Sequence, residues 1–385
     1  MLHPRKRKTP CQRVGLDIGS HTINGVEIVE RDGEMVVRSV GAVQVPVSDE
    51  RQSAPDAGAV VHALKSLWSS ARFECQKVVV ALPADAVYVK WLHLEAPSRD
   101  ELDVTARTAA VRGAPFPVEH AVVDYRILLS RGTTSRNVYF VMLVAANQAE
   151  VDRVLTIVES AGLEPEAVDI GAVAALHSFD TQKRVSNQLW RGQPLAHCIV
   201  GASNTTIIVA RGGELEFART VPVGGNDFTQ CIAEHCKVSR QEADRIKTTP
   251  GNRLIQGGAL LASRNEEELR IPCENVVGRL SREIQRSLRF FTSQFAEGSY
   301  LGMIGGATMS GGGALLKGLD TCLQEQGIDI SGTVNPFTAL SVDAEGGGIQ
   351  HVSESAAQYT TAVGLAIGDR WAGVEHDAPS IEIAA

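Results

Sequence analysis

The residues best suited to chemistry lie in a small polar turn near the start of the chain. Two apolar, β-branched runs, 14–16 and 26–29, flank this turn, and their pattern predicts a strand–turn–strand hairpin. The turn carries small, acidic and hydroxyl-bearing residues: Asp17, Gly19, Ser20, His21 and Thr22. The backbone N–H groups of such a loop can approach an anion closely, and Asp17 can hold Mg²⁺ through water. An ordinary hairpin with an Asx turn is the alternative interpretation.

The composition excludes several classes of protein. The chain has 385 residues, 44% of them hydrophobic and 21% charged, which is typical of globular domains and long enough for two or three. A net charge of −8 argues against a protein that coats nucleic acid. The longest apolar stretch, 138–146, is too short to span a bilayer. No secretory signal is expected, and seven cysteines without paired spacing indicate reduced thiols in a cytoplasm.

The two ends of the chain differ from its middle. Residues 1–13 contain basic residues and no acid: Arg5, Lys6, Arg7, Lys8 and Arg13. We expect a disordered, solvated tail there; weak attraction to anionic lipid is the alternative, at about 1 kcal/mol per basic residue. Residues 372–385 are also expected to be disordered.

Hydrophobic periodicity divides the rest of the chain into two halves. Alternating strands, a helix over 56–73 and a buried strand over 77–82 form half of an α/β domain. The pattern changes at Pro83, where a compact αβ insert begins, and a strand and helix over 166–188 resume the first unit. Three short strands within 196–223 then repeat the opening order of strand, small polar loop and strand.

These patterns predict a division into subdomains. The first comprises 14–82 with 166–190 and contains the insert, 83–165. The second comprises 195–227 with 272–371 and contains a small helical unit, 228–271. Two halves that begin with the same three-strand unit, and a glycine run, 311–313, that opens a late helix, describe the architecture of actin, sugar kinases and Hsp70.

Several segments narrow this resemblance to one family. They read ALPADAVYVKWLHLEAP, RGAPFPVEHAVVDYRIL, VGGNDFTQCI, EIQRSLRFF, NPF and YTTAVGLA. With them the chain resembles, over about 14–371, the PilM family of type IV pilus assembly, also known as competence protein A. The resemblance implies an α/β, actin-like (duplicated ribonuclease H-like) fold with a small inserted α+β subdomain of the type found in FtsA.

The resemblance also implies partners and a cellular place. PilM-like proteins are cytoplasmic scaffolds that bind ATP and capture the N-terminal cytoplasmic tail of PilN, a single-pass inner-membrane protein. The chain would therefore be cytoplasmic and peripheral to the inner membrane through its partners, which include pilus motor ATPases and further copies of itself. Trp91 and Phe116 of the insert are candidates for the peptide groove; core packing is their alternative role.

The family's nucleotide site can be placed on this chain residue by residue. The first phosphate loop is the opening turn, with Asp17 for Mg²⁺. The remaining contacts would be Gly201, Ala202, Ser203, Asn204, Thr205, Gly225, Glu283, Gly311, Gly312 and Gly313. Gly225 has a helix cap as its alternative role, and Glu283 a surface salt bridge.

Two positions depart from the family's pattern. Asn24 stands where the family has a phosphate-binding lysine, and Ile199 stands where it has an aspartate. Since isoleucine can position neither Mg²⁺ nor an attacking water, we expect ATP and Mg²⁺ to bind with little or no hydrolysis.

Two other functions remain as alternatives. One is an ATP-hydrolysing actin-like ATPase, against which Asn24 and Ile199 speak. The other is an FtsA-like cell-division protein, but that family ends in a basic amphipathic helix, whereas residues 377–385 are acidic and short.

Overall fold

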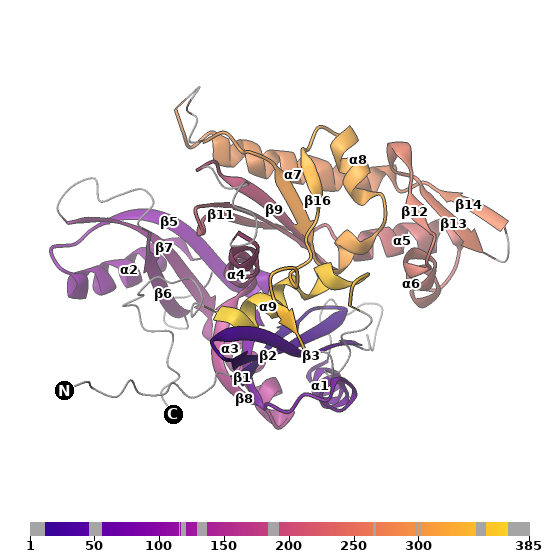
Figure 1. The fold of residues 1–385 in the computed structure, drawn as a ribbon. Coiled ribbons are helices and arrows are strands. Elements are labelled where there is room, and N and C mark those ends of the chain that lie inside the picture. Colours follow the sequence, from indigo (N-terminus) through magenta and orange to yellow (C-terminus); the bar gives the residue numbers. More distant parts are fainter. Residues whose placement is uncertain are drawn as a thin grey trace.

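Two β-sheets with a pair of helices between them form the centre of the molecule, which we describe from a computed structural model (Figure 1). The structure describes residues 12–45, 56–114, 116, 121–128, 137–183, 192–264, 267–296, 299, 302–343 and 352–368. The predicted terminal tails lie outside these residues, apart from 12 and 13. Among the described helices, none is both long and apolar enough to cross a membrane.

The first sheet has the strand order β17-β3-β2-β1-β4-β8. Strands β1 to β3 are antiparallel, whereas β4 and β8 run parallel to β1. The bounds are β1 (Gln12–Ile18), β2 (Thr22–Arg31), β3 (Glu34–Gln44), β4 (Lys77–Leu82), β8 (Glu164–Ile170) and β17 (Ser341–Val342). The opening hairpin predicted from alternation is therefore present, and β1 lies inside the sheet.

Helices cover both faces of this sheet. Helices α1 (Ala57–Ala71) and α3 (Gln148–Ser160) pack on one face, with Leu64 and Val158 fully buried in a common core. Helices α4 (Gly171–Lys183) and α9 (Thr360–Ile367) cover the other, and they cross so closely that a Cβ at Gly364 would lie 1.6 Å from the carbonyl oxygen of Ala174. A residue larger than glycine does not fit at this crossing.

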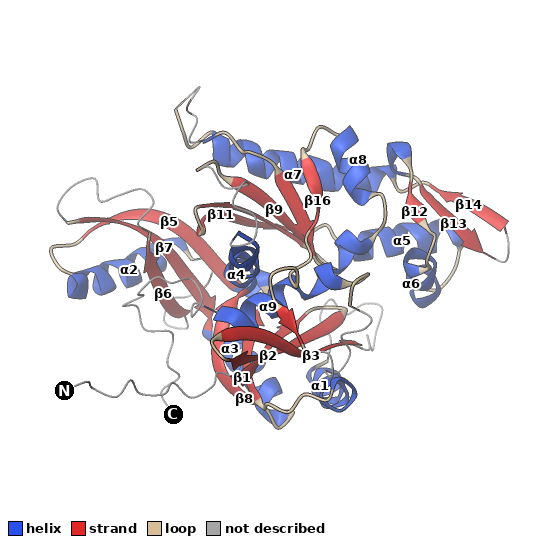
Figure 2. Cartoon of the chain, in the orientation of Figure 1, coloured by secondary structure: helices blue, strands red, loops and turns tan. Residues whose placement is uncertain are grey.

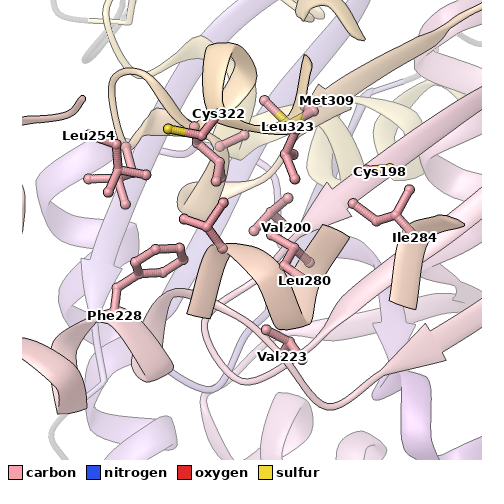
Figure 3. Packing of buried hydrophobic residues seen from close by; sticks show 14 of the residues in the cluster. Cys198, Val200, Val223, Phe228, Leu254, Leu280, Ile284, Met309, Cys322 and Leu323 are labelled. Atoms are coloured by element: carbon pink, nitrogen blue, oxygen red, sulfur yellow. The ribbon is translucent and has the colours of Figure 1, made fainter. Parts of the chain in front are cut away.

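The second sheet repeats the design, with the order β11-β10-β9-β15-β16. Its strands are β9 (Leu195–Val200), β10 (Thr205–Arg211), β11 (Glu214–Val221), β15 (Ala307–Ser310) and β16 (Ile330–Thr333). Helix α4 packs on one face; α5 (Gly225–Cys236), α7 (Glu274–Thr292) and α8 (Leu319–Glu325) contribute to the core on the other. Figure 3 shows this core, where Val200 of β9 and Leu280 of α7 lie close to Phe228 of α5.

The insert is a sheet of order β5-β7-β6 with one helix on its outer face (Figure 2). Its elements are η1 (Ala84–Ala86), β5 (Val87–Glu95), α2 (Arg99–Gly113), β6 (Ala121–Ile127) and β7 (Val138–Asn147). The predicted insert, 83–165, extended too far, because α3 packs against α1 in the core of the first half. An amphipathic pattern shows that a helix is half-buried but does not show against which sheet.

Two other predicted boundaries also differ from the structure. The unit predicted as helical contains, besides α6 (Arg240–Thr248), an antiparallel sheet of β12 (Arg253–Leu254), β13 (Leu260–Arg264) and β14 (Glu267–Ile271). The last predicted part of the second subdomain returns to the first sheet, because β17 pairs with β3 and Val363 of α9 packs in the core formed with β2 and β3. Three short 3₁₀ turns complete the second half and the return: η3 (Gln256–Gly258), η5 (Gly312–Leu315) and η7 (Ala356–Tyr359).

Candidate nucleotide cleft and the seam of the insert

The two polar turns adopt the same conformation in the two halves. In the first hairpin the Gly19 N–H donates to the Thr22 carbonyl at 3.1 Å; in the second the Gly201 N–H donates to the Asn204 carbonyl at 2.8 Å. A Cβ at Gly19 would lie 2.7 Å from the Thr22 oxygen, and a Cβ at Gly201 would lie 2.9 Å from the Asn204 oxygen. Each turn therefore needs its glycine for close backbone approach.

The tips of the two hairpins contact each other. Ser20 Oγ and Ser203 Oγ lie 2.8 Å apart, which is hydrogen-bonding distance between hydroxyl groups 183 residues apart in the sequence. The structure thus brings together the two loops that the sequence predicts as phosphate loops.

Helix α5 supports the second hairpin from behind. The N–H groups of Gly225 and Asn226 donate to the carbonyls of Gly201 (2.9 Å) and Ala202 (2.7 Å). The Asn226 side-chain amide also donates to Ser203 Oγ at 3.2 Å. Gly225 therefore supports the second hairpin at the start of α5, and its contact with a nucleotide stays a prediction.

The glycine run at 311–313 lies against the end of β9. Gly311 has φ 89°, and a Cβ there would lie 2.4 Å from the Val200 carbonyl oxygen; a Cβ at Gly313 would lie 2.5 Å from Val200 Cγ1. At Gly312 an added Cβ would meet nothing within 4 Å. Two of the three glycines are therefore explained by packing, and Gly312 is the one that leaves open space beside the hairpins.

Asp17 and Asn24 face each other across the first hairpin, as register partners on β1 and β2. Burial raises the pKa of the Asp17 carboxyl to about 6, although a hydrogen bond with Asn24 lowers it in part. Asn24 is 6% exposed, and its Oδ1 has no hydrogen-bond partner within the described part of the chain. A carboxylate and an unpartnered amide oxygen are ligands that Mg²⁺ prefers, so this pair fits a hydrated magnesium ion.

Helix α6, which the sequence did not assign to the site, also contacts the first hairpin. His21 Nε2 lies 3.5 Å from Asp244 Oδ2 on α6, and Lys247 Nζ lies 2.7 Å from Asp244 Oδ1. Lys247 also donates to Thr229 Oγ1 at 2.7 Å and to the Gly225 carbonyl at 3.3 Å. The sequence feature that could have indicated this ion pair is the i, i+3 spacing of Asp244 and Lys247, which places both side chains on one face of a helix.

The charges in this group influence one another. Burial lowers the pKa of His21, and Asp244 opposes that shift. Burial alone would raise the pKa of Asp244, but Lys247 and His21 together hold it below its usual value. Lys247 is therefore a cation close to Gly225, whose N–H group supports the second hairpin.

The two predicted groove residues lie on opposite faces of the insert sheet. Trp91 packs with Phe140 against α4 and β10, and its indole Nε1–H donates to the Leu215 carbonyl of β11 at 2.7 Å. Phe116 packs on the other face, in the core with α2. These two side chains therefore do not line one groove: Trp91 fastens the insert to the second half, and Phe116 fills the insert's own core.

A family model described as "Type IV pilus assembly protein PilM" matches residues 15–370. The chain belongs to the PilM family. A solved structure, "PilM-PilN type IV pilus biogenesis complex", is similar to this chain with 25% identity and a TM-score of 0.76, over 93% of this chain and 98% of that one. The resemblance predicted from sequence and the actin-like fold are thus confirmed.

Curated relatives share part of this PilM-family chain. Cell division protein FtsA of Borreliella burgdorferi is 27% identical over 196 residues, and FtsA of Bacillus subtilis is 22% identical over 190 residues. Each match covers 48% of this chain and 45% or 42% of the relative, so the chain spans less than half the length of these curated relatives.

Two further positions lie away from the hairpin tips. Glu283 on α7 pairs with Arg219 on β11 at 3.5 Å. This is the salt bridge that we gave above as the alternative to a nucleotide contact. Ile199, at the family's aspartate position, packs against the apolar cluster that contains Val173 and Ile208. The isoleucine side chain thus lies in an apolar environment between the sheet and α4.

Proposed function

We propose that this PilM-family protein is a cytoplasmic adaptor of type IV pilus assembly, held at the inner membrane by the N-terminal tail of a PilN-like protein. The supporting observation is the similarity to the chain of the PilM–PilN complex, which extends over 98% of that chain. A likeness of that extent includes the insert as well as both actin-like halves. An adaptor needs no catalytic residue, and we assign none.

We further propose that the cleft binds ATP with Mg²⁺ as a structural ligand. Ser20 and Ser203 mark the point where the two hairpins meet, and Gly312 leaves room beside them. Asp17 and Asn24 would hold the magnesium ion through their oxygens, and the ion would neutralise phosphate charge. Lys247, held by Asp244, Thr229 and the Gly225 carbonyl, would add positive charge near the second hairpin.

We do not expect this protein to hydrolyse the ATP that it binds. The family's aspartate position holds Ile199, whose side chain packs in an apolar cluster. The carboxylate of Asp244 is paired with Lys247 and approached by His21. Isoleucine has no oxygen with which to position Mg²⁺ or an attacking water, so we expect little or no hydrolysis of ATP.

The adaptor proposal is tested by peptide binding. A fluorescent peptide of the PilN-like protein's N-terminal cytoplasmic segment, from the same organism, is titrated with the full chain and followed by anisotropy. We expect saturable binding that a scrambled peptide of equal composition does not show. Equal binding of both peptides, or of neither, would contradict the proposal.

A further inference from the structure

The exposed face of helix α7 carries a row of arginines without ion-pair partners. Arg282, Arg286 and Arg289 are exposed and follow one another by four and three residues, so they lie on one face of the helix. No acidic group lies within ion-pair distance of them among the residues that the structure describes. Their neighbours differ: Arg279 pairs with Asp227, and Glu283 pairs with Arg219. Acids outnumber Lys and Arg by 45 to 37 in this chain, so an unpaired basic row needs an explanation.

Exposed apolar side chains adjoin this row. Phe290 follows Arg289 and is 56% exposed, and Met303 is 57% exposed. Phe290 lies on the side of α7 that meets Phe217 of β11. On the other side of α7, beside β15 and β16, lies an open hollow of about 450 Å³ whose lining includes Leu288, Arg289, Ile304, Ile328 and Asp329. Arginine, methionine and aromatic residues are enriched in protein–protein interfaces, whereas a purely solvated helix face has no need of them.

Helix α2 of the insert carries the complementary surface. Asp100, Glu101 and Asp103 are exposed at its start, where they also suit the positive end of the helix dipole. Val104, among them, is 67% exposed and is the most exposed large apolar side chain in the described part of the chain. Figure 1 shows α2 at the outer end of the insert and α7 along the second half, so the two surfaces belong to different edges of the molecule.

We propose that α7 of one copy binds α2 of a second copy of this chain. Carboxylates on α2 match the arginines on α7, and Val104 supplies an apolar side chain for the hollow beside Arg289. Arginine suits this task because its guanidinium pairs with carboxylates in two-point geometry. This inference does not depend on the proposed function.

The contact is head-to-tail, because the two surfaces differ. Every copy keeps one free α2 and one free α7 after a pair has formed, so the contact either closes into a ring or continues as a filament. A membrane with anionic lipid is a different occupant for the same arginines, and the experiment separates the two.

Charge reversal tests the proposal by sedimentation velocity of the full chain. One variant carries Arg282→Glu, Arg286→Glu and Arg289→Glu; the other carries Asp100→Lys, Glu101→Lys and Asp103→Lys. A matched control reverses exposed arginines on other elements than α2 and α7, Arg153→Glu, Arg245→Glu and Arg270→Glu. The wild type should associate in a concentration-dependent way, and more weakly as salt rises from about 0.1 M to about 1 M, over which the Debye length falls from about 10 Å to about 3 Å.

Each reversed variant alone should lose association by at least about tenfold, since like charges then face each other. An equimolar mixture of the two should regain it, because opposite charges meet at both kinds of contact, and this recovery also shows that both variants are folded. The control should associate like the wild type. Monomers at all wild-type concentrations, unchanged association in either variant, or a mixture that stays monomeric would overturn the proposal. So would arginine-dependent binding to phosphatidylglycerol vesicles without any effect on self-association.

Discussion

Ser20 and Ser203 stand on separate halves of the chain, and their hydroxyl oxygens lie 2.8 Å apart at the tips of two hairpins of the same design. Each hairpin is closed by the same glycine-to-carbonyl hydrogen bond, Gly19 to Thr22 and Gly201 to Asn204. The two hairpins therefore meet at their tips, and any ligand held by both hairpins connects the two halves.

A nucleotide titration tests the cation site in this cleft. Asp17→Ala should weaken binding of ATP with Mg²⁺ by at least about tenfold, because the substitution removes a carboxylate ligand. Calorimetry measures this, with Asp152→Ala on the exposed face of α3 as the matched control. A non-hydrolysable analogue should bind as tightly as ATP. Equal affinity of wild type and Asp17→Ala would refute the assignment of Asp17.

Restoring the family's lysine gives a second test of the same loop. Asn24→Lys places a cation beside Asp17, so ATP should bind about tenfold more tightly through a charge-assisted contact with phosphate. Asn24→Leu, which has no oxygen and no charge, should bind more weakly than the wild type. Calorimetry measures the ATP affinity of the wild type and of both variants. Equal affinities in all three would contradict a phosphate site beside residue 24.

The pH dependence of stability reports on Asp17. Burial raises the pKa of its carboxyl from 3.8 to about 6 in the folded chain. The folded state therefore favours the protonated form, and this contribution is fully present below pH 3.8 and is lost as the pH rises through about 6.

The measurable quantity is the difference in free energy of unfolding between wild type and Asp17→Asn. It should fall by at most about 3 kcal/mol as the pH rises from about 4 to about 7, since one pKa unit corresponds to about 1.4 kcal/mol. Urea unfolding at a series of pH values gives this difference, and a difference that stays constant with pH would contradict a raised pKa.

Two helix glycines separate close packing from helix propensity. Gly364→Ala forces a Cβ against the Ala174 carbonyl at the crossing of α9 and α4, so it should lower the free energy of unfolding by about 3 kcal/mol or more. Gly278→Ala on α7 meets only the flexible end of Arg282, at 3.3 Å, and should raise stability by up to about 1 kcal/mol. Urea unfolding measures the free energy of unfolding of both variants. Changes of the same sign and size in the two variants would contradict the close packing at Gly364.

Trp91 distinguishes a seam residue from a peptide contact. Trp91→Phe removes the donor to the Leu215 carbonyl and leaves that oxygen without its partner, which should cost about 1–2 kcal/mol. Affinity for the PilN-like peptide should stay within about twofold of wild type. A large loss of peptide affinity with unchanged stability would instead return Trp91 to the groove.

Side-chain alternation and turn residues predicted the strands and hairpins whose formation depends on neighbouring residues in the sequence. Alternation located β1, β2, β9 and β10, and their turn residues indicated the two hairpins, because side-chain period and turn chemistry act within a few residues. It did not detect β13 and β14, which are short; β14 also begins with two exposed acidic residues, Glu267 and Glu268. The sequence also does not show that the face of β5 with Trp91 meets β11, because that contact joins positions 124 residues apart.

The same limit applies to the site. The turn sequences around Gly19 and Gly201 predict their roles. The contact between Asp244 and His21, in contrast, joins positions that are 223 residues apart. That contact depends on how the small unit with α6 sits over the first hairpin, which no local spacing encodes. The sequence likewise does not show that Gly311 and Gly313 pack against Val200 of β9 whereas Gly312 does not.

Recruitment to a membrane tests the adaptor role most directly. The full chain is mixed with liposomes that contain the full-length PilN-like protein, and with liposomes whose PilN-like protein lacks its N-terminal cytoplasmic segment; both are then floated through a density gradient. We predict that the chain floats with the first liposomes and stays at the bottom with the second. Equal flotation with both, or with neither, would contradict the proposal that the partner's tail holds this protein at the membrane.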